Sequence, residues 1–227
     1  MNKDLIAYLT QFMTPERLER MNTVLNARTR YTTVVLENIF QSQNASAVLR
    51  TCECLGIQDV HIIENTNKFN LNPDVVRGSS NWLTIHKYNK RSNDNTVSAI
   101  DALKNQGYRI IATTPHKDEC SPAGFDLSKG KAAFVFGTEM QGISKAVMER
   151  ADEFMKIPMY GFTESFNISV TVAIAMNHIV EKLRRSDISW QLEPEEKDQL
   201  LSGWMEQSIQ SGDMLVKHFY EKIAGSR

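Results

Sequence analysis

IPMYGFTESFNISVTVAIAMNHIVEKL, residues 157–183, decides how the last third of the chain folds. A proline ends a predicted strand, a short polar loop follows, and an apolar helix comes next. Apolar residues recur in this helix at steps of three and four, which places them on one face: Ile168, Val172, Ala175, Met176, Ile179, Val180 and Leu183. Ser165, Asn167 and Ser169 stand where the helix begins, so side-chain oxygens and free backbone N–H groups converge at its positive end. This arrangement predicts either a site for a polar ligand or a simple helix cap.

Upstream of this stretch, short apolar strands alternate with helices. We predict strands at residues 32–37, 60–64, 82–88, 108–113, 132–136 and 154–157. We predict helices between them at residues 45–55, 73–76, 97–105 and 144–151. The inner strands are continuously apolar, as expected for a parallel sheet with helices on both faces. The pattern therefore predicts a doubly wound α/β domain with its ligand at the carboxyl ends of the strands.

Both terminal regions are predicted to be helical. Residues 1–29 form two short helices, with Thr14 as N-cap and Pro15 as first residue of the second. Two more helices are expected at residues 194–210 and 214–224. We therefore divide the chain into an N-terminal helical extension (1–29), an α/β domain (30–186) and a C-terminal helical extension (187–227).

Composition narrows the classes of function. The 227 residues carry 26 Lys and Arg against 27 Asp and Glu, a net charge of −1 that is not typical of a nucleic-acid binder, although arginines crowd the N-terminal helices. No apolar run is long enough to span a membrane and the N-terminus does not resemble a signal peptide, so we expect a cytoplasmic protein. The three cysteines and five histidines show no zinc-ligand spacing, so we expect no metal.

The loop GTEMQGIS, residues 137–144, follows a predicted strand and matches a phosphate-binding loop only in part. Its two glycines have the P-loop spacing, but Ile143 stands where the lysine should be and Glu139 adds a negative charge. A nucleotide hydrolase is therefore disfavoured, and the absence of a GxGxxG pattern disfavours a dinucleotide site. A neutral or cationic ligand against the glycine backbone fits better, with a sharp turn and a solvated glutamate as the alternative.

A third polar stretch follows the first predicted strand. We expect Asn44 or Ser46 to cap the next helix, which places Arg50 on its second turn. A single arginine on an otherwise small and apolar helix indicates a phosphate or carboxylate partner, because guanidinium binds oxyanions in a bidentate way. A surface arginine that lies over a core helix is the alternative.

Taken in order, these three stretches resemble the signature motifs of one family. They are NASAVLRT (44–51), GTEMQGIS (137–144) and IPMYGFTESFNISV (157–170). Their patterns NxSAxxRT, GxExxGIS and IPMxGxxxSxNxSV are similar to those of the SPOUT methyltransferases. Within that class they resemble the SpoU/TrmH branch of RNA 2′-O-ribose methyltransferases, over residues 32–184.

The resemblance implies a sheet whose C-terminal segment is threaded into a trefoil knot, an exception to the rule that chains are unknotted. It implies that S-adenosylmethionine (AdoMet) binds in this knot. The implied cofactor contacts are Thr113, Thr114, Gly137, Thr138, Glu139, Gly142, Ile157, Ser165, Phe166 and Asn167. Phe166 departs from the family, which has leucine there. The resemblance also implies a homodimer with the catalytic arginine near the partner's cofactor.

The implied catalytic residue is Arg50, supported by Asn44, Glu139, Ser165 and Asn167. Because arginine holds its proton firmly, we interpret Arg50 as a group that stabilises the forming 2′-alkoxide and holds the adjacent phosphate. RNA affinity is expected from six arginines: Arg17, Arg20, Arg28, Arg30, Arg184 and Arg185.

The terminal helices resemble those of the tRNA guanosine-2′-O-methyltransferases of this branch, which methylate a guanosine in the D-loop. The sequence therefore predicts an AdoMet-dependent enzyme that acts on tRNA. A ribosomal RNA 2′-O-methyltransferase and a non-catalytic RNA-binding homologue are the alternatives, and the presence of Asn44, Arg50 and Glu139 disfavours the second.

Overall fold

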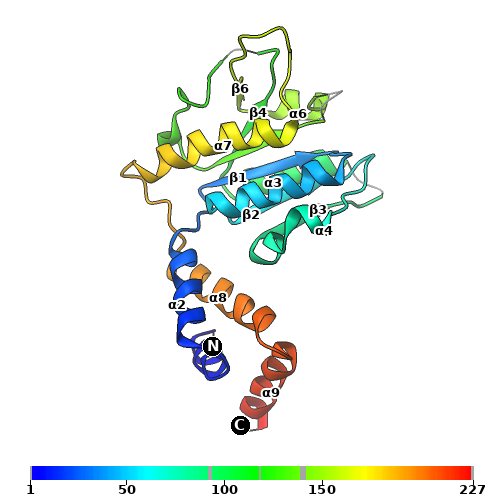
Figure 1. Ribbon diagram of the computed structural model, residues 1–227. Coiled ribbons are helices and arrows are strands. Elements are labelled where there is room, and N and C mark those ends of the chain that lie inside the picture. The colour runs from blue at the N-terminus through cyan, green and yellow to red at the C-terminus, as the bar shows by residue number, and fades with distance from the viewer. Residues whose placement is uncertain (1, 92–93, 118, 139–141, 226–227) are drawn as a thin grey trace. The chain divides into compact units, whose positions relative to one another are not determined.

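The computed structural model describes residues 2–91, 94–117, 119–138 and 142–225 (Figure 1). The chain forms two compact units. The larger unit is continuous and contains residues 29–190. The smaller unit joins the two terminal regions, residues 1–28 and 191–227.

A six-stranded sheet forms the centre of the larger unit. Its strands are β1 (Thr32–Glu37), β2 (Asp59–Ile63), β3 (Thr84–Tyr88), β4 (Arg109–Thr113), β5 (Ala132–Phe136) and β6 (Glu153–Met155). They lie in the order β3-β2-β1-β5-β4-β6, and each neighbouring pair is parallel. The predicted parallel sheet is therefore confirmed, and all six predicted strands are present with ends that differ by up to two residues.

The pairing of β1 with β5 decides where a ligand can bind. The order of the strands reverses at this pair, because β2 and β3 lie beyond β1 while β4 and β6 lie beyond β5. Val34 pairs with Phe134 and Leu36 with Phe136, so the two strands end at the same level. The loops that follow them leave the sheet side by side, at the position where α/β proteins of this kind bind their ligands.

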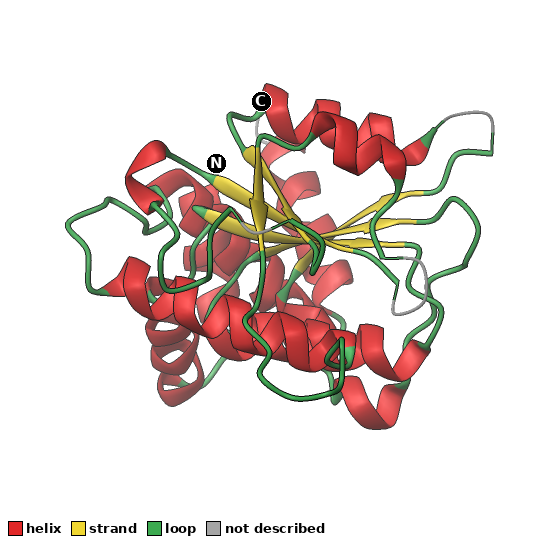
Figure 2. Ribbon diagram, turned by 90° about the horizontal axis from the view of Figure 1, so that it is seen from above, coloured by secondary structure: helices red, strands yellow, loops and turns green. Residues whose placement is uncertain are grey.

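Helices cover both faces of the sheet (Figure 2). On one face lie α3 (Ser42–Leu55), α4 (Pro73–Val76) and α7 (Ile168–Arg184). On the other lie α5 (Asn95–Asn105) and α6 (Lys145–Arg150). Two short 3-10 turns, η1 (Ser79–Trp82) and η2 (Leu127–Lys129), complete the unit.

The apolar face predicted for α7 is confirmed. All seven of its predicted apolar residues are buried, and they pack with α3 against the sheet. Burying a valine, leucine, isoleucine or methionine side chain stabilises a fold by roughly 1.5–3 kcal/mol. This face therefore holds α7 in place, and with it the polar loop that precedes the helix.

The helix after β1 begins earlier than predicted. It starts at Ser42 with Gln41 as its N-cap residue, so neither Asn44 nor Ser46 is the cap. Asn44 is buried, and its Nδ2 donates to Gln41 Oε1 at 3.0 Å. Ser46 is also buried, and its Oγ accepts from the backbone N–H of Asn72 at 2.8 Å. The side chain of Asn44 therefore makes a local contact and that of Ser46 a tertiary one, which a capping rule based on residue type does not distinguish.

The smaller unit is helical, as predicted. It contains α1 (Asn2–Thr10), α2 (Pro15–Asn26), α8 (Pro194–Ser208) and α9 (Gly212–Gly225). Thr14 is the N-cap of α2, and its Oγ1 accepts from the N–H of Arg17 at 3.3 Å. The buried side chains that join these helices include Leu9, Leu25, Trp204 and Phe219.

Two features are absent from the described residues. None of the helices they form has the length and apolar character needed to cross a bilayer. They also contain no group of three or more His, Cys, Asp or Glu side chains placed to hold a metal ion.

A buried histidine lies on the α5 face of the sheet. The side chain of His61 on β2 has its Nδ1 3.1 Å from the Tyr88 hydroxyl, and its ring stacks on His86 with 4.5 Å between ring centroids. Burial, with the charge of His86 as a second cause, lowers the pKa of His61 from 6.5 to about 4. The folded protein therefore holds this imidazole in its neutral form.

We predict that His61 makes folding stability dependent on pH. Between pH 6.5 and about 4 the unfolded chain binds a proton at His61 that the folded chain does not. The destabilisation is therefore absent above pH 6.5, grows as the pH falls, and reaches about 3 kcal/mol near pH 4. Urea unfolding of the wild type and of His61→Gln from pH 7.5 to 4.5 measures it. An equal pH dependence in the two proteins would contradict this assignment.

Candidate active site

A cavity of about 820 Å³ opens at the carboxyl edge of the sheet. Its wall comes from the loops after β4, β5 and β6 and from the first turn of α7. Seven of the predicted cofactor contacts line it: Thr113, Thr114, Gly137, Thr138, Gly142, Ser165 and Phe166. Apolar residues such as Phe136 and Met148 line it as well. A cavity of this size and mixed lining suits an organic ligand that has both apolar and polar parts.

The loop after β5 is closed at its base by backbone contacts. The Thr138 N–H donates to the Gly142 carbonyl at 3.0 Å, and the Gly142 N–H donates to the Thr138 carbonyl at 2.9 Å. A Cβ at Gly137 would lie 2.0 Å from the Gly142 carbonyl oxygen, so only glycine fits there. Gly142 has a φ of +66°, which also favours glycine. The two glycines of the predicted motif therefore let two backbone segments approach closely beside the cavity.

A buried carboxylate joins this loop to β1 and α5. Glu37 ends β1 with 2% of its surface exposed. Its Oε1 accepts from the hydroxyls of Thr96 at 2.6 Å and Ser144 at 2.7 Å. Its Oε2 accepts from the backbone N–H of Ser144 at 2.8 Å. Ser144 is the N-cap of α6, so Glu37 connects the end of β1 to the segment that closes the cavity after β5.

The start of α7 is joined to the start of α3. Asn167 is the N-cap of α7, and its Oδ1 accepts from the N–H and the hydroxyl of Ser169 at 2.9 and 2.6 Å. Its Nδ2 donates to Asn44 Oδ1 at 3.1 Å. The structure therefore brings together Asn44 and Asn167, two residues that lie 123 positions apart in the chain.

Other predicted site residues lie outside the cavity lining. Ile157 packs against the core on the α3 and α7 face. Glu139 lies outside the residues that the structure describes. The cofactor and catalytic roles assigned to all these residues stay predictions.

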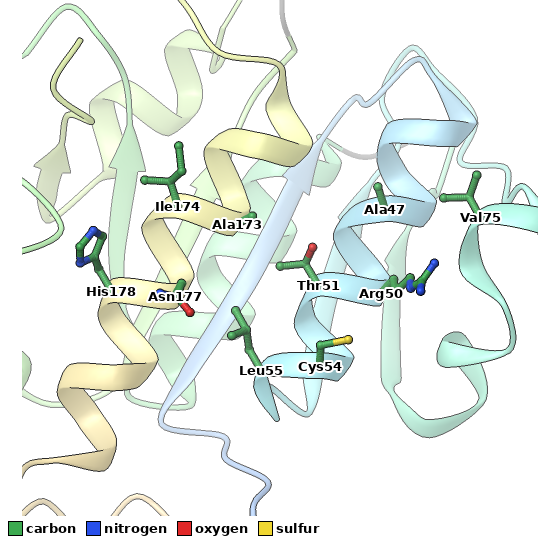
Figure 3. A pocket seen from close by; sticks show the side chains of 10 residues that line it. All are labelled: Ala47, Arg50, Thr51, Cys54, Leu55, Val75, Ala173, Ile174, Asn177 and His178. Atoms are coloured by element: carbon green, nitrogen blue, oxygen red, sulfur yellow. The ribbon is translucent and has the colours of Figure 1, made fainter. Parts of the chain in front are cut away.

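Arg50 lies at a second cavity, of about 710 Å³, between α3 and α7 (Figure 3). Its side chain is exposed and extends toward the side on which Val75 of α4 lies. Asn177 and His178 of α7 line the opposite side of this cavity. The two cavities have no lining residue in common. Within this chain, Arg50 therefore lies at a different cavity from the residues predicted to hold the cofactor.

The arginines predicted to bind RNA differ in their surroundings. Arg17 and Arg20 are exposed on α2. Arg28 is fully buried and its guanidinium lies 5.4 Å from the centroid of the Trp204 ring, so we no longer expect it to contact RNA. Arg28 was predicted to bind RNA from its residue type and its place among other arginines, and neither property shows whether a side chain is buried.

Three more of these arginines lie at the amino edge of the sheet. Arg30 Nε donates to Asp59 Oδ2 at 3.0 Å, and Arg184 donates to the Leu55 carbonyl at 3.1 Å. Arg185 is exposed and pairs with Glu181 at 3.1 Å. Their role in RNA binding stays a prediction.

Sequence reasoning missed two features of the site. The first is Glu37, which the sequence could have indicated because it is a charged residue at the end of an otherwise uncharged strand, TTVVLE. Tyr160 and Phe162 are almost completely exposed on the loop that lines the cavity, with relative exposures of 96% and 108%. No pattern in the sequence distinguishes exposed aromatic residues from core residues.

We predict that Glu37→Gln weakens the fold through the loop after β5. The amide would place an N–H group against donors that now bind a carboxylate, so the free energy of unfolding should fall by about 1–3 kcal/mol. Chemical denaturation measures this change. The matched control is Glu149→Gln on α6, whose partner Lys145 lies at 3.4 Å on the surface and which should cost under about 1 kcal/mol. Equal losses in the two variants would contradict the role given to Glu37.

Comparison with known proteins gave a family match and close relatives. The model of the SpoU rRNA Methylase family matches residues 31–177. A tRNA (guanosine(18)-2′-O)-methyltransferase from Borreliella burgdorferi is 47% identical over 206 residues, which cover 91% of this chain and 92% of the relative.

Solved structures show the same fold. The TrmH/SpoU tRNA modifying enzyme of Aquifex aeolicus superposes with a TM-score of 0.75 at 30% identity, over 86% of this chain and 98% of that chain. The SpoU methyltransferase AviRb from Streptomyces viridochromogenes, solved in complex with AdoMet, superposes with a TM-score of 0.59 over 72% of this chain and 62% of that chain. Its identity is 20%, so it supports the fold alone.

The family model covers more than half of the chain, and the matched residues include all three motifs quoted above. The B. burgdorferi relative extends the similarity to nine tenths of the chain, beyond the region that the family model matches. The resemblance inferred from the motifs is confirmed, and this chain belongs to the SpoU rRNA methylase family.

Proposed function

We propose that this protein transfers a methyl group from AdoMet to the ribose 2′-oxygen of a guanosine in tRNA, in the D-loop. We choose tRNA as the substrate because the chain is 47% identical, over 91% of its length, to the B. burgdorferi tRNA (guanosine(18)-2′-O)-methyltransferase. The family model ends at residue 177 and starts at residue 31, so it does not include the terminal helices. Identity that extends into those helices therefore favours the substrate of that relative over ribosomal RNA.

The cavity at the carboxyl edge suits AdoMet, which supplies an activated methyl group on a sulfonium. Gly137 and Gly142 expose backbone at its wall, and Phe136, Met148 and Phe166 offer apolar surface to an adenine ring. Thr113, Thr138 and Ser165 would hold polar parts of the ligand. Glu164 and Lys156 also line the cavity, so it offers one negative and one positive side chain to a ligand that carries both signs of charge.

The chain after β6 supports the proposed trefoil knot. The Thr114 N–H donates to the Met155 carbonyl at 3.0 Å, and the Lys156 N–H donates to the Cys120 carbonyl at 2.9 Å. Residues 155–156 therefore run between the two ends of the 114–120 segment. The knot itself belongs to this proposal, and it would bring the loops after β4, β5 and β6 around one ligand.

Arg50 is proposed to stabilise the attacking oxygen. Its guanidinium is exposed at the α3 and α7 cavity and forms no ion pair with any carboxylate among the described residues. Arginine does not lose its proton near neutral pH, so it acts as a hydrogen-bond donor and not as a base. A forming 2′-alkoxide and the adjacent phosphate both offer oxygens to its planar fork, while the hydroxyl proton leaves to that phosphate or to water.

A homodimer would complete the site. Arg50 and the proposed AdoMet residues line two separate cavities of one subunit. If Arg50 is to reach the reacting ribose, it must face the AdoMet cavity of a second copy of this chain. The α3 and α7 face that carries Arg50 would then lie at the contact between subunits.

The reaction is tested by incubating the protein with AdoMet labelled on its methyl group and with unmodified tRNA or ribosomal RNA. We predict that label enters tRNA, and that digestion yields 2′-O-methylguanosine because the ribose oxygen is the acceptor. Ribosomal RNA is the necessary comparison because the matching family is described as rRNA methylases. Label in ribosomal RNA only, or on a base, would contradict the proposal.

A second prediction concerns the role of Arg50. Arg50→Ala should lower kcat by about 10²–10³-fold, as expected when a donor to a developing oxyanion is lost, while AdoMet binding measured by calorimetry stays unchanged. Arg50→Lys should also be slow, because a single ammonium cannot bind the alkoxide and the phosphate in a bidentate way. The control is Arg150→Ala on α6, which pairs with Asp101 at 3.0 Å and should turn over normally. Near-normal turnover of Arg50→Lys would argue against the planar fork.

A further inference from the structure

Residues 68–91 form a segment of the larger unit with a strong excess of positive charge. They contain five Lys and Arg residues and one acidic residue, Asp74, in a chain whose net charge is −1. All five cations are exposed. We call them the basic face: Lys68, Arg77, Lys87, Lys90 and Arg91.

These cations differ from most others in the same unit by having no anionic partner. Among the described residues, none of the five forms an ion pair with a carboxylate. Elsewhere in the unit, carboxylates pair with Arg30, Lys104, Arg109, Lys129, Lys145, Arg150 and Arg185. Lys182 and Arg184 donate to backbone carbonyls. Like charges gathered without counter-charges repel one another, so a surface of this kind favours an anionic partner.

The basic face begins beside Arg50. Val75 of α4 lines the same cavity as Arg50 (Figure 3). Arg77 is the C-cap residue of α4. The Nζ of Lys87 on β3 lies 5.4 Å from the centroid of the Phe69 ring, and Phe69 packs in the core on the α3 side of the sheet. The cations therefore extend from the neighbourhood of Arg50 to β3, the strand at the edge of the sheet.

The backbone that carries these cations is held in place by side chains. The Asn72 N–H donates to the buried Ser46 of α3 at 2.8 Å, and Asn72 Oδ1 caps α4. Asn95 Oδ1 accepts from the Lys90 N–H at 3.0 Å, and Asn95 Nδ2 donates to the Lys90 carbonyl at 3.3 Å. An ordered backbone lets the cations meet a partner without first losing the freedom of the loop.

We propose that the basic face binds the phosphodiester backbone of the RNA substrate, along the strand that leads away from the ribose at Arg50. This rests on the proposed function. Phosphates repeat along an RNA strand, and lysines and arginines that have no competing carboxylate can bind them. The basic face fixes the position of the RNA and carries no base recognition. It therefore adds affinity for RNA beyond that of the arginines of the terminal helices.

The test compares two triple variants with the same change in charge. Lys68→Gln/Lys87→Gln/Lys90→Gln neutralises the basic face. Lys104→Gln/Lys129→Gln/Lys131→Gln neutralises three exposed lysines near the opposite, amino edge of the sheet. RNA binding is measured without AdoMet, from 50 to 300 mM salt, with an unmodified tRNA transcript. Circular dichroism and AdoMet binding check that both variants fold, and Lys68→Gln alone provides a milder change.

The basic-face variant should bind RNA at least tenfold more weakly at 100 mM salt. The slope of log K against log salt should become shallower by about two, because roughly 0.7–0.9 is lost per phosphate contact. Lys68→Gln alone should lower the slope by just under one. In methylation assays KM for RNA should rise while kcat stays within twofold.

Equal losses in the two triple variants, or unchanged RNA binding in the first, would overturn the proposal. Equal competition by polyglutamate and RNA for the wild type, at matched charge concentration, would also overturn it in favour of an acidic protein partner. If the wild-type protein binds RNA through the basic face but methylates no RNA, the proposed RNA-binding surface is retained. That result would refute the proposed function instead.

Discussion

The parallel pairing of β1 with β5 is the constraint on which the rest of the site depends. It places the ends of two strands level with each other at the point where the strand order reverses. Glu37 then fixes the loops at that point, because its buried carboxylate accepts from Thr96 and Ser144. A carboxylate removed from water is costly unless donors surround it, so the hydrogen bonds to Glu37 favour the assembled arrangement of these segments. The cavity wall after β5 is thereby set by the sheet.

We interpret this arrangement as a separation of two tasks. One cavity gathers loops from three strand ends and the close backbone approach at Gly137, which suits the methyl donor. The other places Arg50 on the α3 and α7 face, beside the cations that we assign to the RNA backbone. The contact between Asn44 and Asn167 links the two helices on which these tasks depend. A dimer that brings the two kinds of cavity together would let the enzyme hold the donor rigidly while the RNA binds across the contact.

Much of the fold follows from the sequence, because apolar periodicity reports burial directly. Strands such as AAFVF and the seven-residue face of α7 are where the pattern places them. Prediction was poorer for polar residues: Asn44 and Ser46 form tertiary contacts instead of capping α3, and Arg28 is buried. The family resemblance indicated seven residues that line one cavity, but the buried role of Glu37 depends on donors 59 and 107 positions away. Partners that distant leave no local pattern.

The central claim is that the methyl donor binds where the loops after β4, β5 and β6 meet. A crystal structure of the protein grown with AdoMet tests it most directly. The account predicts density for the donor in the cavity lined by Thr113, Gly137 and Ser165, with Arg50 of a second copy facing its methyl group. Density for the donor in the cavity between α3 and α7, or an Arg50 turned away from both copies of the donor, would contradict it.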